Sequence, residues 1–153
     1  MKLINPSVEL ITQTPGLEGI YKQIERVGRV CYKSEDKITE DSAKPFVERM
    51  IKSQHLAMLE HGTVYLGASS NSEDLIFWKV ANSPYSKVVC NDRANMLYVT
   101  TNLRVIAELN AWEVIDKYLC EPTELHIKRI CLKFITSIGV SREFNRHKLL
   151  CAA

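Results

Sequence analysis

The chain has 153 residues, of which 46% are hydrophobic and 25% are charged, and its formal net charge is +2 at pH 7. These values are typical of one globular domain over residues 1–153, and no apolar run approaches the roughly 20 residues of a membrane span. No signal-peptide pattern is present, and the small net charge argues against a nucleic-acid partner, so we expect any anion site to be local.

The five cysteines are scattered through the chain and include no Cys-x-x-Cys pair. An odd number of isolated thiols is typical of a reduced, cytoplasmic protein rather than of a disulfide framework. A zinc site from Cys120, His126 and Cys131 is conceivable, but this spacing matches no compact ligand motif. We therefore predict a cytoplasmic protein without a metal site.

Residues 1–15 carry Pro6 and Pro15 beside a short apolar run, which predicts an extended lead-in or edge strand. Apolar residues then recur at helical spacing from about Gly16 to Tyr32, with polar residues such as Glu25 opposite them. This pattern predicts an amphipathic helix that has Glu25 on its polar side.

A polar loop at 33–37 precedes a second predicted helix, whose apolar positions begin at Ala43. Pro45 must lie near the first turn of this helix, because proline is tolerated there and not further in. The position of the proline favours Ser42 or Asp41 as the N-cap.

The block 55–62 contains two histidines and a glutamate and leads into a β-rich run at 63–66, which predicts a strand. The three polar side chains suggest a site, although a hydrogen-bonded structural histidine is the commoner explanation. Small polar residues at 67–72 predict a turn, and a short helix is predicted at 73–81.

Two short strands are predicted at 86–91 and 95–101, joined by a turn at Asp92-Arg93. Asn102 is a suitable cap for the helix that follows, and Asn110 is expected to divide this helix into two pieces.

Alternating residues from 127 to 137 predict a last strand, which a turn connects to a final helix. The predicted strands are short, unevenly spaced and not separated by regular crossover helices. We therefore expect an α+β fold, with helices packed on a small, mainly antiparallel sheet.

The final helix, predicted at 139–148, brings three cations, a carboxylate and an imidazole into one short segment. On a helix, Glu143, Arg146 and His147 share a face, and Arg142 and Arg146 form an i, i+4 pair. Guanidinium groups bind phosphate through two parallel hydrogen bonds, so this face suits a ligand that carries phosphate.

Two blocks of the chain resemble motifs of the flavin-dependent thymidylate synthases (ThyX). Ser141-Arg142-Glu143 followed by Arg146-His147-Lys148 resembles the family's signature, which has an Arg-His-Arg core. The block His55-Leu56-Ala57-Met58-Leu59-Glu60-His61 is similar to the family's His-x-Ser/Thr-x-Leu/Phe-Glu-His block, and the first helix, which ends in Cys31-Tyr32-Lys33-Ser34, resembles its N-terminal segment. With residues 98–124 matching an insert that some members carry, the resemblance covers essentially the whole chain.

The resemblance implies FAD-dependent reductive methylation of dUMP to dTMP, with methylenetetrahydrofolate and NADPH as co-substrates. It implies a homotetramer whose flavin sites lie between protomers, and the family's α+β fold without its C-terminal helical part. The flavin contacts implied are His55, Ala57, Arg146, His147 and Lys148, and the dUMP contacts are Arg142, Glu143 and Arg146. An imidazole can stack on or hydrogen-bond to a flavin without acting as a nucleophile.

Two residues depart from the family's pattern: Lys148 replaces an arginine, and Ala57 replaces the serine or threonine of many members. The rest of the signature and the family's dUMP-activating arginine are expected beyond the end of the chain. We therefore expect an incomplete domain with weak or lost synthase activity. The alternatives are a non-catalytic flavin- or nucleotide-binding module and an inactive truncated relic. The sign of a relic would be exposed apolar surface around Val140, Phe144, Leu149 and Leu150.

Overall fold

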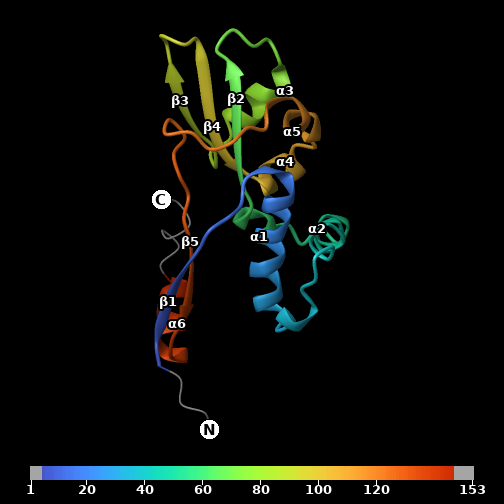
Figure 1. Ribbon diagram of the computed structural model, residues 1–153, viewed down its shortest axis with the longest axis vertical. Coiled ribbons are helices and arrows are strands. Elements are labelled where there is room, and N and C mark those ends of the chain that lie inside the picture. The colour runs from blue at the N-terminus through green and yellow to red at the C-terminus, as the bar shows by residue number, and fades with distance from the viewer. Residues whose placement is uncertain (1–4, 147–153) are drawn as a thin grey trace. The chain divides into compact units, whose positions relative to one another are not determined.

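The structure is a computed structural model that describes residues 5–146 (Figure 1). The chain forms two compact units, one from residues 13–128 and one from residues 1–12 together with 129–153. The single domain expected over residues 1–153 stays a prediction. Among the described residues, no helix is both long enough and apolar enough to cross a membrane.

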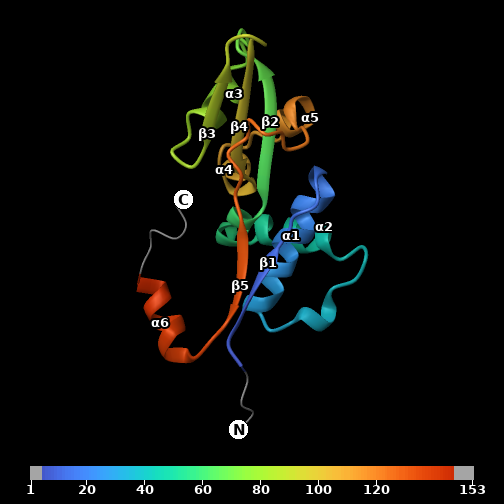
Figure 2. The same ribbon diagram turned by 60° about the vertical axis from the view of Figure 1, so that its left-hand side comes forward.

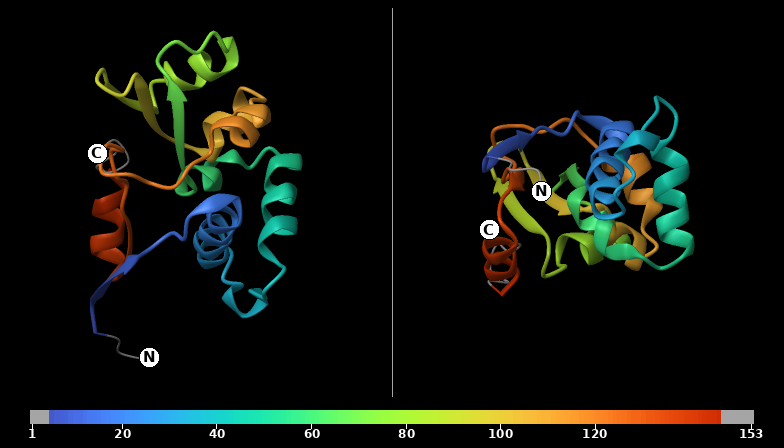
Figure 3. Two further views of the ribbon diagram at one scale, coloured as in Figure 1. Left: turned by 45° about the horizontal axis from the view of Figure 1, so that its top comes forward. Right: turned by 90° about the horizontal axis from the view of Figure 1, so that it is seen from below.

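The unit of residues 13–128 begins with helices. Helix α1 (Gly16–Cys31) and helix α2 (Ala43–Lys52) confirm the two amphipathic helices, and Figure 3 shows them side by side. A short 3-10 helix, η1 (Glu35–Lys37), lies between them, and a second one, η2 (Leu56–His61), follows α2.

The prediction for the start of α2 is only partly confirmed. Pro45 lies in the first turn and Ser42 is the N-cap residue, but its side chain does not cap the helix. The Ser42 hydroxyl instead accepts a hydrogen bond from the Thr39 N–H and donates one to Glu25. Glu25 itself is 1% exposed, so its predicted place on the polar side of α1 is wrong.

A three-stranded antiparallel sheet follows, in the order β2 (Thr63–Ser69), β4 (Met96–Asn102), β3 (Lys87–Asn91), as Figure 2 shows. The β3–β4 pairing confirms the predicted hairpin. The turn predicted from Gly67 is wrong, because β2 continues to Ser69. Ala68 pairs with Leu97 of β4 and is buried, so pairing and burial keep these small residues extended.

Helix α3 (Leu75–Ala81) precedes the hairpin, and α4 (Leu103–Glu108) and α5 (Trp112–Tyr118) follow it. The Asn102 side chain accepts a hydrogen bond from the Val105 N–H at 3.1 Å, which confirms the predicted cap. Asn110 has a φ of +49° between α4 and α5, so the predicted division is also confirmed. The side chains that form the core of this unit include Ile20, Ile24, Phe46, Leu59, Leu66, Phe77, Val99 and Ile106.

The second unit pairs β1 (Ser7–Ile11) with β5 (Cys131–Ile135) in an antiparallel ribbon, and α6 (Ile138–Arg146) follows. The expected edge strand and final helix are confirmed within the described residues, and the last strand is shorter than predicted. The α+β class is confirmed, but the strands form two small antiparallel sheets rather than one.

Candidate functional site

The block predicted to contact the flavin forms η2 and the residue before it. His55 is the N-cap residue of η2, and the block ends where β2 begins. Leu59 is completely buried in the core and anchors the block, whereas His55, Ala57 and His61 are exposed. Leu59 therefore anchors a short turn of chain from which His55, Ala57 and His61 face solvent, while Leu56 and Met58 pack partly against the core.

His55 contacts the C-terminal end of α1. The Tyr32 hydroxyl lies 3.3 Å from Nδ1 of His55, and Tyr32 is the C-cap residue of α1, with its N–H bonded to the Gly28 carbonyl at 3.1 Å. When the hydroxyl donates to Nδ1, the neutral ring carries its hydrogen on Nε2. This contact joins the segment 31–34 to the block 55–61 and leaves an N–H of His55 for another acceptor.

The other end of the block is held by α4. The guanidinium of Arg104 forms an ion pair with Glu60 and donates from Nε to Glu108 at 2.6 Å. The pKa of Arg104 is raised by Glu108 and then by Glu60. In addition, the Leu103 N–H donates to the Gly62 carbonyl at 2.9 Å. The ends of η2 are thus fixed by α1 and α4, which the sequence separates widely.

Three more of the predicted site residues, Arg142, Glu143 and Arg146, belong to α6. The Ser137 hydroxyl accepts a hydrogen bond from the Val140 N–H at 3.4 Å and so caps the start of this helix. Arg142 and Glu143 are exposed, and Arg146 is the last residue of the helix. Helical geometry places Arg142 and Arg146 on one face, as predicted.

The predicted site is therefore divided between the two units, with His55 and Ala57 on one and the α6 residues on the other. His147, Lys148, Leu149 and Leu150 lie outside the described residues, as do the side chains of Phe144 and Arg146. Of the four residues named as the sign of a relic, Val140 alone has a described side chain, which is 45% exposed, so the relic alternative stays a prediction.

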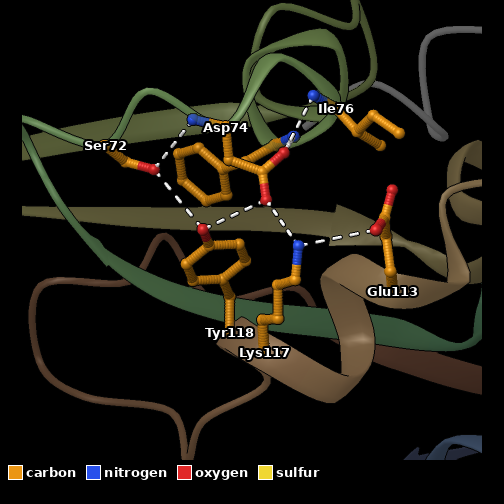
Figure 4. Close-up of polar contacts among 7 residues, drawn as sticks. Ser72, Asp74, Ile76, Glu113, Lys117 and Tyr118 are labelled. Carbon is orange, nitrogen blue, oxygen red and sulfur yellow. Dashed lines mark hydrogen bonds and ion pairs between the residues drawn. The ribbon is translucent and has the colours of Figure 1, made fainter.

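Sequence reasoning missed a polar cluster around Asp74, the N-cap residue of α3 (Figure 4). Its Oδ1 accepts hydrogen bonds from the N–H groups of Ile76 at 3.0 Å and Phe77 at 3.1 Å. Its Oδ2 accepts from Lys117 Nζ at 3.1 Å and from the Tyr118 hydroxyl at 3.2 Å. The sequence contains the N-cap signal before an apolar run, but nothing in it marks partners 43 and 44 residues away.

We expect the Asp74 cluster to stabilise the fold at neutral pH and to lose this effect in acid. The Phe77 N–H and then Lys117 lower the pKa of Asp74. A carboxyl group with a lowered pKa stabilises the folded state above its ordinary pKa, and this contribution disappears as the pH falls through the lowered value. Asp74→Ala should lower the thermal unfolding midpoint at pH 7, with a smaller difference near pH 3.

Asp74→Asn is the matched variant, because its amide oxygen can still cap α3 while the negative charge is lost. Its unfolding midpoint should lie between those of the parent and Asp74→Ala. Equal midpoints for all three proteins at pH 7 would show that the cluster contributes nothing.

Cys120 and His126 do meet, with Sγ and Nε2 3.8 Å apart, but Cys131 belongs to the other unit. Burial raises the pKa of the Cys120 thiol, which disfavours the thiolate that binds metal or acts as a nucleophile. Among the described residues there is no group of three or more His, Cys, Asp or Glu side chains that could hold a metal ion.

Comparison with known proteins adds no relative. No family model, no curated protein and no solved structure matches this chain.

Proposed function

We propose that the chain acts as a flavin-dependent thymidylate synthase, which methylates dUMP reductively with methylenetetrahydrofolate, FAD and NADPH. The observation that carries the proposal is the pair of family-like blocks in the family's order, at 55–61 and 141–148. The geometry of the first block supports it, because His55 and Ala57 are exposed while Leu59 anchors the turn and Arg104 holds its end. A fixed, solvent-facing turn is suited to contact a ligand.

The chemistry of the residues fits FAD and dUMP. His55 offers an exposed imidazole whose Nδ1 contacts the Tyr32 hydroxyl; when that hydroxyl donates to Nδ1, Nε2–H is the donor left for a flavin carbonyl. Arg142, Arg146 and Lys148 supply cations for phosphate groups. FAD, when bound, supplies the reducing electrons for the methylation, and NADPH replenishes them.

Two departures from the family's pattern predict weak turnover. Lys148 supplies a point charge where a guanidinium fork would bind through two parallel hydrogen bonds, and Ala57 lacks a hydroxyl group. A protein that keeps ligand-binding groups but loses transition-state contacts binds without much turnover. This reasoning makes a non-catalytic flavin- and nucleotide-binding module the second candidate function.

The proposal also includes a cytoplasmic homotetramer with flavin sites between protomers. Cys31, Cys90, Cys120 and Cys131 are free thiols, which supports a reducing compartment.

The test measures FAD binding by flavin fluorescence, dUMP binding by calorimetry, and tritium release from labelled dUMP with all co-substrates. We expect FAD and dUMP to bind, with turnover far below that of an active family member, and Lys148→Arg to raise the turnover. Binding without any turnover, even in Lys148→Arg, would favour the binding module. Absence of FAD binding would contradict both candidate functions. Turnover comparable with that of an active family member would contradict the prediction that this chain turns over weakly.

A Tyr32→Phe variant tests whether the first block takes part. It removes one hydrogen bond, worth about 1 kcal/mol, that orients the His55 ring, so FAD affinity should fall by up to roughly fivefold. Tyr85→Phe is the control, because Tyr85 is 69% exposed and lies far along the chain from both blocks. Equal affinities for the two variants would remove His55 from the proposed site.

A further inference from the structure

His126 is a buried histidine that the proposed function does not use. Its side chain lies against the three-stranded sheet and packs edge to face on two tyrosine rings. The centroid of its ring is 5.1 Å from that of Tyr65 on β2 and 5.3 Å from that of Tyr98 on β4. The residue is 3% exposed. It belongs to the stretch of chain between α5 and β5, which connects residues 13–128 to the unit that carries α6.

Both ring nitrogens of His126 have backbone partners. The Thr123 N–H lies 3.0 Å from Nδ1, and the Leu66 carbonyl oxygen lies 3.1 Å from Nε2. A backbone N–H can only donate and a carbonyl can only accept. The contacts therefore require the neutral ring, with a lone pair on Nδ1 and the hydrogen on Nε2.

This ring is the main attachment of residues 121–128 to the sheet. Just before them, Leu119 forms an isolated β-bridge with Leu66, and the Cys120 N–H donates to the Tyr65 carbonyl at 3.0 Å. From 121 to 128 every residue except His126 is exposed. Loss of the contacts of this one side chain would therefore free the whole stretch.

We propose that His126 is a pH-sensitive latch, whose protonation releases residues 121–128 from the three-stranded sheet. A proton on Nδ1 removes the acceptor of the Thr123 N–H and places two donors 3.0 Å apart, and only the Thr123 hydroxyl, also 3.0 Å from Nδ1, can accept the new Nδ1–H. It also creates a charge in a buried site, which is costly without a counter-charge. Release of the stretch hydrates the imidazolium and removes both penalties.

The groups that face the ring do not offset this charge. They are the phenols of Tyr65 and Tyr98 on the sheet, the thiol of Cys120 in the connecting chain and the uncharged hydroxyl of Thr123, which lies 3.0 Å from Nδ1. Phenols and thiols are uncharged between pH 5 and 7. The charged residues of the stretch itself, Glu121, Glu124 and Lys128, are exposed.

The titration of His126 gives the direction of the effect. Burial lowers its pKa, and the hydrogen bond to the Leu66 carbonyl opposes this shift. A histidine whose pKa is lower in the folded state binds more protons when released. The latch is therefore closed above the ordinary pKa of histidine, about 6.5, and opens as the pH falls below it. The consequence is a longer free connection to β5 and α6 in acid.

The latch is tested by amide hydrogen exchange at about pH 7.5 and about pH 5.5, on either side of the ordinary histidine pKa, with intrinsic rates corrected. We expect protection of the Thr123 amide to fall roughly tenfold in acid, as expected for an opening equilibrium coupled to one proton. Protection in β4 should stay unchanged. Equal protection of Thr123 at both pH values would overturn the proposal.

His126→Asn is the matched control, because its Oδ1 can accept the Thr123 N–H and its side chain does not titrate. Protection of Thr123 in this variant should not depend on pH, and a loss equal to that of the parent would overturn the latch. If the variant does not fold, an NMR titration of the parent decides. His126 and the Thr123 amide should then shift with one midpoint below 6.5, and separate midpoints would contradict the proposal.

Discussion

Glu25→Ala is expected to lower the free energy of unfolding by about 3–5 kcal/mol, because it leaves a buried charge without its partner. Both Nε and Nη2 of Arg29 donate to Oε1 of Glu25, at 3.1 and 2.9 Å, and the Ser42 hydroxyl donates to Oε2 at 2.8 Å. The side chains of Glu25 and Arg29 are 2% and 11% exposed. The Arg29 guanidinium also lies over the Phe46 ring of α2, 4.8 Å from its centroid.

Urea unfolding followed by circular dichroism measures this loss. Glu18→Ala is the control, because Glu18 forms an i, i+4 ion pair with Lys22 on the same helix but is exposed, and it should leave stability unchanged within error. Replacing the buried pair together, by Glu25→Leu with Arg29→Met, should cost less than Glu25→Ala alone, since no unpaired charge remains. A loss below about 1 kcal/mol for Glu25→Ala would place this pair with ordinary surface ion pairs.

Gly62→Ala is expected to lower the free energy of unfolding by about 1–3 kcal/mol through overpacking. Gly62 follows η2 with a φ of −84°, so alanine suits the backbone. The added Cβ would lie 2.6 Å from Cδ1 of Ile24 and 2.8 Å from Cγ2 of Ile20 on α1. Both isoleucines are buried, at 0% and 1% exposure, and cannot move away freely. The cost therefore comes from the contact between α1 and the candidate site block.

A double-mutant cycle isolates this contact. Ile24→Val removes Cδ1, so the double variant with Gly62→Ala should be more stable than the sum of the single losses predicts. Gly139→Ala is the control, because its Cβ would meet only the Ser137 hydroxyl at 3.9 Å. At this exposed helical position alanine should be neutral or stabilising by up to about 1 kcal/mol. Additive losses for Gly62→Ala and Ile24→Val would show that the close approach to Ile24 is absent.

The helices and their ends were largely predictable, because the signals that define them are local. Apolar spacing of three and four residues located α1 and α2, and Asn102 and Asn110 marked the start and the division of the helices after β4. The errors involve residues whose partners are distant in sequence. Ala68 stays in a strand because it pairs with Leu97, and Ser42 turns from its helix toward Glu25.

In the candidate site, too, local features were predictable and contacts between distant residues were not. The cations at 141–148 were enough to propose a ligand that carries phosphate, because guanidinium groups bind phosphate through two parallel hydrogen bonds, whereas the flavin contacts at 55–61 are what the family resemblance implies. The residue types did not indicate that Tyr32 would engage His55, or that Arg104 would engage Glu60. The cluster around Asp74 and the buried ring of His126 were missed for the same reason.

By itself, the sequence determined the α+β class, the amphipathic helices, the hairpin and the exposed, charged character of the last helix. Only the tertiary structure decided which polar side chains are buried and paired, among them Glu25 with Arg29 and His126 with Leu66 and Thr123. The physical reason is that helical period and capping depend on neighbours within about four residues. Burial and hydrogen-bond pairing depend on which distant segments the collapsed core brings together.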